Sequence, residues 1–327
     1  MSQVQLPASV GWILAGLFTL FSALPLWATE PLPAALPPLP PANSAFSQAS
    51  GVEPVGKAAS DRYGWFNTLD QRSVYGQFWF PEPLRADEGD VDNELRLDYF
   101  HSEKAHHQFD QVKTEIEYAI GLMTLEIAGG YESDRSLTPN DADGFDHETD
   151  AGFTNIELAA RYPFLQFVSP GGFFDDTFVA GLEVAPPTHT KVSEDLEIVP
   201  KIFNLLRLGE HFSLQTGGGL STLVGPQARG LSVLEYNAVF GYELTHEVLP
   251  LPLTSRITPI FEIDGETVLN HDDRGINSLL GTVGCRFDLD AIGPLQPRLG
   301  LGYTFPLDQG GRQELNWGVV TSLIFEY

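Results

Sequence analysis

From residue 93 onward, apolar and polar residues alternate along stretches of about ten residues, separated by turn-rich breaks. Leu95, Leu97 and Tyr99, for example, are interleaved with charged residues. Strict alternation is typical of a strand with one apolar and one polar face. The pattern predicts twelve strands, near residues 94–99, 112–120, 125–131, 153–163, 176–187, 197–206, 211–223, 232–244, 255–266, 276–288, 296–305 and 314–327.

Such strands suit either a soluble β-sandwich or a transmembrane barrel. The connections favour an antiparallel up-and-down transmembrane β-barrel of about 12 strands. If the first strand rises from the periplasm, the long acidic connection 132–150 lies outside the cell. The tight turns 120–123 and 207–210 then face the periplasm, as does the C-terminus, whereas the longer connections 164–175 and 245–254 fit this rule less well.

The last strand places Trp317, Leu323, Phe325 and Tyr327 on one face. An alternating final strand with a terminal aromatic residue resembles the assembly signal of bacterial outer-membrane barrels. The alternative is an ordinary terminal strand of a soluble β protein.

The N-terminal region divides into three segments before the barrel at 93–327. Residues 1–28 contain no ionisable side chain, and their apolar core at 10–24 predicts a signal peptide cleaved after Ala28; an uncleaved anchor is the alternative. Residues 29–62 form a proline-rich and then small, polar linker. Residues 63–92, rich in aromatic side chains at first, are an entry segment that could occlude the lumen.

The net charge of −26, from 44 acidic and 18 basic residues, argues against nucleic acid as a partner. The single cysteine excludes a disulfide framework and a cysteine-rich metal site. In a barrel, the acids belong to the lumen and the external loops, because lipid-facing positions are apolar. The expected location is the outer membrane of a Gram-negative bacterium, with lipid, the barrel-assembly machinery and a small solute as partners.

The region from about residue 74 resembles the outer-membrane family named after the MetA pathway of phenol degradation, a family of transporters. The resemblance lies in PEPLRADEGDVDNELRLDYFHSE, FDQVKTEIEYAIG and the IFEY ending, and covers about three quarters of the chain. It implies passage of small compounds, aromatic or hydrophobic ones among them, and supplies no site residues.

Charged residues on the polar strand faces are the candidate lumen and selectivity residues. They are Arg96, Asp98, Lys113, Glu115, Glu117, Glu126, Glu157, Arg161, Glu183, Lys201, Glu235, Glu262, Asp264, Arg286 and Arg298. Glu115 and Glu117 stand ~7 Å apart along one face, a spacing open to glycosidase chemistry. Pairing across strands is the favoured interpretation, and an acid-rich lumen favours cations. The sequence therefore predicts a passive, non-enzymatic channel without a cofactor.

Two alternatives remain. His211 and Ser213 have the His-x-Ser order of twelve-stranded outer-membrane phospholipases, although Leu214 and Gln215 follow where that family has Asn-Gly. A structural or adhesin-like barrel would instead act through its acidic loops. No metal site is predicted, because the loop carrying Asp141, Asp143, Asp146, Glu148 and Asp150 does not fit an EF-hand register, which leaves these five as candidates for adventitious Ca²⁺ or Mg²⁺ only.

Overall fold

The computed structural model describes residues 80–90, 93–120, 123–140, 144–169, 173–189, 195–226 and 230–327. For residues 137–140, 144–148 and 168 it describes the backbone alone. The predicted signal peptide and linker therefore lie outside the described residues.

The described chain is almost entirely β-structure. In chain order its elements are β1 (Glu94–Lys104), β2 (His107–Ile120), β3 (Met123–Asn140), β4 (Gly144–Phe153), β5 (Glu157–Val168), β6 (Phe174–Ala185), β7 (Leu196–Leu208), β8 (Phe212–Val224), β9 (Ser232–Tyr242), β10 (Leu244–Thr245), β11 (Thr254–Val268), β12 (Asn277–Leu289), β13 (Gln296–Pro306), α2 (Gly311–Glu314) and β14 (Trp317–Glu326). Within this part of the chain, no helix is long and apolar enough to cross a membrane.

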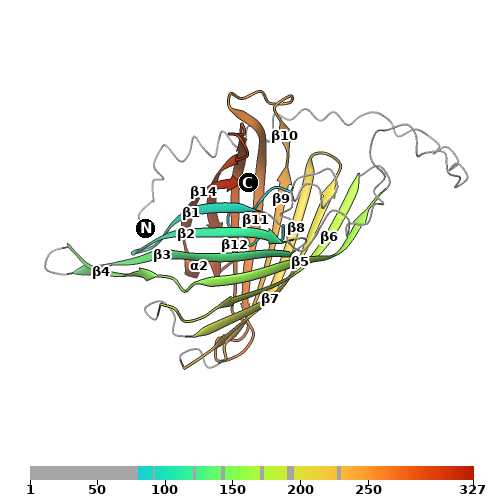
Figure 1. Cartoon of the computed structure of the whole chain (residues 1–327). Coiled ribbons are helices and arrows are strands. Elements are labelled where there is room, and N and C mark those ends of the chain that lie inside the picture. The colour runs from blue at the N-terminus through green and yellow to red at the C-terminus, as the bar shows by residue number, and fades with distance from the viewer. Residues whose placement is uncertain are drawn as a thin grey trace, which may run out of the picture. The chain divides into compact units, whose positions relative to one another are not determined.

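The strands form one closed antiparallel barrel. Each barrel strand pairs with its neighbours in chain order, β14 returns to pair with β1, and β9 pairs with β11. Figure 1 shows the first and last strands side by side. The barrel wall has twelve strands, because β4 pairs only with the outer half of β3, and the two-residue β10 pairs only with β11. The predicted fold class is confirmed.

The even number of wall strands brings the start of β1 and the end of β14 to one end of the barrel, which we call the base. The opposite end, with the β3–β4 hairpin and α2, is the mouth. At the base, Leu95 is opposite Phe325 and Glu94 is opposite Glu326, so the apolar and polar faces of the two strands are in register.

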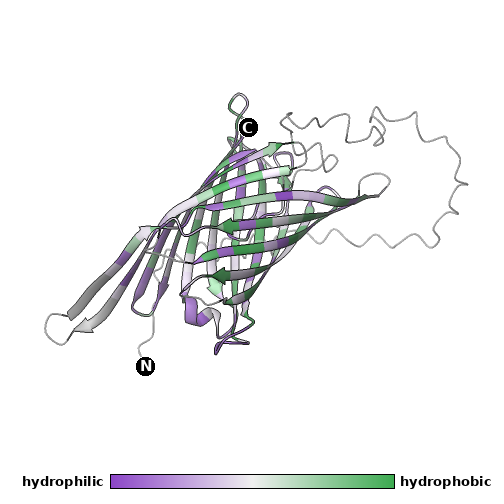
Figure 2. Ribbon diagram, turned by 60° about the horizontal axis from the view of Figure 1, so that its bottom comes forward, coloured by the Kyte–Doolittle hydropathy of each residue, from purple (hydrophilic) through white to green (hydrophobic). Residues whose placement is uncertain are grey.

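The outer surface of the barrel is apolar. Exposed large side chains on the wall include Leu97, Ile116, Tyr162, Ile202 and Leu301. Figure 2 shows hydrophobic and hydrophilic residues alternating along the wall strands. The inward positions between them carry most of the buried charged residues of the described chain. A closed sheet satisfies every backbone hydrogen bond of the wall, which is the condition for a β-structure in hydrocarbon.

The region 132–150 departs from the prediction. It was expected to be a loop, but β3 runs on to Asn140 and pairs with β4 from Tyr131↔Phe153 outward, leaving only 141–143 between them. This hairpin has polar residues on both faces, so it lacks the alternation that identified the other strands. Backbone pairing needs no such alternation. The following wall strand correspondingly lies at Glu157–Val168 rather than at 153–163.

Candidate functional site

The predicted lumen residues do lie on the inner face of the wall. Most alternate with outward-facing apolar neighbours, and several are almost completely buried. Arg286 and Arg298 are among the largest fully buried side chains of the described chain. So many charges inside one barrel require partners, because an unpaired buried charge is very costly.

Some of those partners come from the stretch just before β1. Residues 80–90, which we call the inner segment, lie inside the barrel, and almost all of them are buried. Leu84, 1% exposed, packs with Ala86 against Val239, Ile260 and Val320 from three different wall strands. Of the entry segment that could occlude the lumen, residues 80–90 are described, and they occupy part of the barrel interior.

The backbone of the inner segment is held by side chains of the wall. The carboxylate of Glu262 on β11 accepts hydrogen bonds from the backbone N–H groups of Leu84, Arg85 (3.0 Å) and Ala86 (3.3 Å). On β8, the side chain of Gln215 accepts from the N–H of Gly89 at 3.1 Å and donates to the carbonyl of Asp87 at 2.7 Å. Side chains of the wall thus accept hydrogen bonds from four backbone N–H groups of a segment that has no sheet partner.

Arginine side chains of the wall donate hydrogen bonds to the backbone carbonyl groups of the inner segment. Arg286 donates to the carbonyls of Glu82 and Pro83, and Arg96 donates to those of Pro83 and Leu84 at 3.2 and 3.3 Å. Arg161 donates to the carbonyls of Glu88 and Asp90 at 3.1 and 3.2 Å. These are charge-assisted bonds, the stronger class of hydrogen bond.

The acidic side chains of the inner segment form ion pairs with basic residues from around the barrel. Glu82 pairs with Arg298 on β13, and Asp87 pairs with Lys201 on β7 at 2.6 Å. Glu88 pairs with both Arg96 on β1 and Arg161 on β5, at 3.3 Å each. The inner segment is therefore tied to widely separated parts of the wall.

Pairing across strands, which was predicted for the lumen charges, also occurs. Lys113 pairs with Glu157 at 2.7 Å, Lys201 with Glu183 at 2.5 Å, and Arg161 with Glu126 at 2.5 Å. Sequence reasoning missed the inner segment as the main partner of the arginines. The available signal was the acid-rich stretch PEPLRADEGD immediately before a strand whose inward side chains include Arg96.

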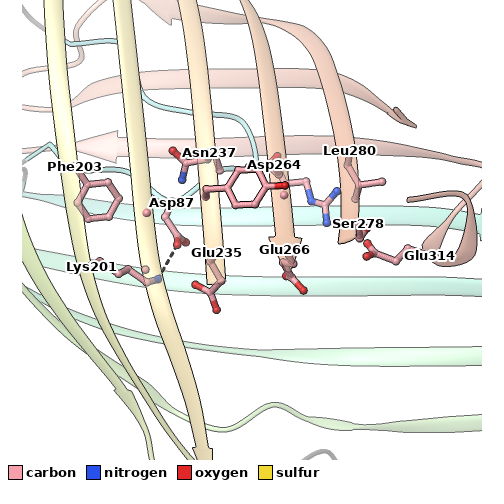
Figure 3. A pocket seen from close by; sticks show the side chains of 16 residues that line it. Asp87, Lys201, Phe203, Glu235, Asn237, Asp264, Glu266, Ser278, Leu280 and Glu314 are labelled. Atoms are coloured by element: carbon pink, nitrogen blue, oxygen red, sulfur yellow. Dashed lines mark hydrogen bonds and ion pairs between the residues drawn. The ribbon is translucent and has the colours of Figure 1, made fainter. Parts of the chain in front are cut away.

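A cavity of about 170 Å³ lies between the inner segment and one side of the wall. Figure 3 shows Asp87 and Lys201 facing each other there, with Glu235 and Glu266 from neighbouring strands. Its charged lining residues are Arg85, Asp87, Lys201, Glu235, Asp264, Glu266 and Glu314, and Phe203 and Tyr236 add aromatic surface. With five acids against two bases, the cavity favours cationic groups.

At the mouth, Asp308 organises the turn before α2. One carboxylate oxygen accepts from the N–H groups of Gly311 (2.7 Å) and Leu279 (3.0 Å), and the other accepts from the side chain of Asn277 at 2.8 Å. These donors, led by the Gly311 N–H, stabilise the charged form and hold the pKa of Asp308 below its ordinary value. The turn that borders the mouth is thus fixed by one carboxylate.

The residues of the hydrolase alternative are not arranged for catalysis. His211 lies in the turn between β7 and β8, where its Nδ1 is 2.9 Å from the carbonyl oxygen of Glu243. Ser213 is buried, and its hydroxyl has no hydrogen-bond partner among the described residues. The serine therefore lacks the hydrogen-bonded base that activates a nucleophile.

The remaining candidates are the acids of the 141–150 region and the residues of the last strand. Asp141 and Asp143 fall outside the described residues, as do the side chains of Asp146 and Glu148; Asp150 is exposed on β4. Of the terminal aromatic residues, Trp317 lies beside His101, with ring centroids 5.4 Å apart, and Tyr327 is half-exposed. Leu323 and Phe325 lie on the outer face, opposite Leu97 and Leu95. Their role in assembly stays a prediction.

No protein-family model matches the chain, and no curated protein matches it. Among solved structures, it is similar to the COG4313 outer membrane channel from Pseudomonas putida F1, with 12% identity, a TM-score of 0.45, and coverage of 76% of this chain and 100% of that one. The NanC porin matches with 8% identity and a TM-score of 0.43, covering 71% of this chain and 98% of that one. The β domain of the Bordetella autotransporter BrkA matches with 12% identity and a TM-score of 0.37, covering 72% and 98%. The resemblance to the MetA-pathway family is not confirmed.

Proposed function

We propose that the protein is an outer-membrane channel for the passive passage of small solutes, and that its inner segment closes the lumen. The apolar outer surface of a closed barrel supports the membrane location, because such a surface is stable only against lipid. The proposal includes export through the N-terminal signal and insertion by the barrel-assembly machinery.

The observation that carries the proposal is how the inner segment is held. Its contacts with the wall are chiefly hydrogen bonds and ion pairs, with two small apolar clusters, one around Leu84 and one around Phe80. Water can replace polar contacts when the segment leaves, whereas a large apolar core would make leaving costly. The arrangement suits a removable closure better than a permanent core.

The solute class follows from the charge of the interior. Five acids and two bases line the 170 Å³ cavity, together with Phe203 and Tyr236. Acidic linings select cations, and aromatic faces bind organic cations. We therefore propose small cationic or neutral solutes, with aromatic compounds among them.

Planar lipid bilayers test the proposal. Purified mature protein and a variant lacking residues 80–90 are inserted and compared under a salt gradient. The variant should show discrete current steps with a reversal potential on the cation-selective side, and the full chain should be closed most of the time. An absence of steps from both correctly folded proteins would overturn the channel function.

The two alternatives give different results in the same preparations. Lipid hydrolysis that is lost in Ser213→Ala, without any current, would favour an enzyme. Binding to cell surfaces that depends on the β3–β4 hairpin, again without current, would favour an adhesin-like barrel.

A further inference from the structure

Four glutamates meet near the base of the barrel. Glu88 comes from the inner segment, Glu94 from β1, and Glu115 and Glu117 from β2, and all four are buried. One carboxylate oxygen from each lies within 4.8 Å of the others. Among the described residues this is the one group of carboxylates so arranged.

The pairing of β1 with β2 places two of these glutamates directly opposite each other. Glu94 and Glu117 are register partners, and both side chains are 0% exposed. Like charges opposite each other destabilise a sheet, and burial increases the cost. Something has to compensate for this pair.

Glu94 is the member of the pair that lacks a hydrogen-bond partner among the described residues. Neither of its carboxylate oxygens accepts a hydrogen bond from the described part of the chain. Arg161 forms ion pairs with Glu117 and Glu88, and Arg96 forms ion pairs with Glu88 and Asp98. A fully buried carboxylate with two unsatisfied oxygens, close to three others, is the arrangement that a bound cation would satisfy.

The balance of charge points the same way. The cluster and the two acids that share its arginines comprise six acids: Glu88, Glu94, Asp98, Glu115, Glu117 and Glu126. The basic residues paired with them are Arg96, Arg161 and Lys113, and Lys113 also pairs with Glu157. The excess is three negative charges, and a single divalent cation would neutralise two of them.

The size and the ligand type of the cluster together favour one divalent cation. Calcium–oxygen distances of about 2.3–2.6 Å place opposite ligands roughly 4.6–5.2 Å apart, and magnesium at about 2.1 Å needs about 4.2 Å. The upper limit of 4.8 Å between the four oxygens accommodates calcium, and four protein carboxylates suit its 6–8 oxygen ligands better than magnesium, which keeps several of its waters. We propose that Glu88, Glu94, Glu115 and Glu117 form a calcium site that joins the inner segment to β1 and β2.

Calorimetry on the full mature chain tests the site. After treatment with EDTA, protein in detergent is titrated with CaCl₂ and separately with MgCl₂. We expect one calcium per chain at this site, bound more tightly than magnesium. In Glu94→Gln the affinity for calcium should fall at least roughly tenfold, because affinity depends on the number of charged ligands. Glu115→Gln, in which the Glu94–Glu117 pair is intact, should also weaken binding.

Two controls separate this site from other acids. Glu243→Gln removes a buried carboxylate that is held by Arg207 and Arg256 away from the cluster. Asp141→Asn combined with Asp143→Asn removes acids of the external hairpin connection. Both should bind calcium as the unaltered protein does. No binding, or binding equally strong in Glu94→Gln, would overturn the proposal, and this readout does not depend on whether the protein conducts.

Discussion

Replacing Glu262 by leucine should release the inner segment. The leucine fills part of the volume but accepts no hydrogen bond, so the N–H groups of Leu84, Arg85 and Ala86 lose their acceptor in the buried state. Each unsatisfied buried donor costs roughly 1–3 kcal/mol. The state with the inner segment bound inside the barrel should therefore be destabilised by roughly 3–9 kcal/mol, relative to a released state in which water accepts hydrogen bonds from the same three N–H groups.

At about 1.4 kcal/mol per factor of ten, this cost shifts the equilibrium toward the released state by roughly two to six powers of ten. The assay is the open probability of single molecules in planar bilayers. Glu235→Leu is the matched control, because Glu235 lines the cavity but makes none of the hydrogen bonds that hold the described residues of the inner segment. Glu262→Leu should be open far more often than both the unaltered protein and Glu235→Leu. Equal open probabilities in all three would refute the reasoning.

Three further outcomes follow from the fold. The folded barrel should migrate differently from the boiled protein in detergent electrophoresis, and a single unchanged band would contradict a closed barrel. Tyr327→Ser should reduce insertion by the barrel-assembly machinery severalfold in a proteoliposome assay; unchanged insertion would remove the role assigned to Trp317, Leu323, Phe325 and Tyr327. Because the pKa of Asp308 is lowered in the folded state, its contribution to the turn is present above the unfolded value of about 3.9 and is lost as the pH falls through the lower folded pKa. Hydrogen exchange at Gly311 and Leu279 in Asp308→Asn at pH 7 should then be faster than in the unaltered protein.

The wall of the barrel could be predicted from sequence because its signal is local. Each wall strand has lipid on one side and the polar interior on the other. The polarity of a residue such as Leu97 or Arg96 therefore indicates which face of the strand its side chain occupies. The pairing of β1 with β14 also follows once the strands are counted, since an even number returns the chain to the base. The β3–β4 hairpin has no such difference in polarity between its two faces. Its extension beyond the wall therefore could not be predicted from an alternation of apolar and polar residues.

The contents of the barrel could be predicted only in part. The sequence placed Arg96, Arg161 and Arg286 inside but did not identify their partners. Residues 80–90 have no period, and their contacts with Glu262 and Arg298 join positions about two hundred residues apart. Charge balance was the one indication, since acids in the stretch match basic residues on the wall. The cluster of Glu88 with Glu94 also requires residues 80–90 to lie inside the barrel, so it could not be predicted from the sequence either.

A reversible cross-link gives the most direct test that the inner segment closes the channel. A β-carbon placed on Gly89 would lie 2.5 Å from that of Phe203, and a disulfide with about 3.8 Å between β-carbons needs a shift of about 1 Å. Gly89→Cys and Phe203→Cys are combined with Glu262→Leu and with Cys285→Ala, which removes the chain's one native cysteine. Current should disappear on oxidation and return on reduction. Current that persists while the disulfide is shown to be formed would contradict the account.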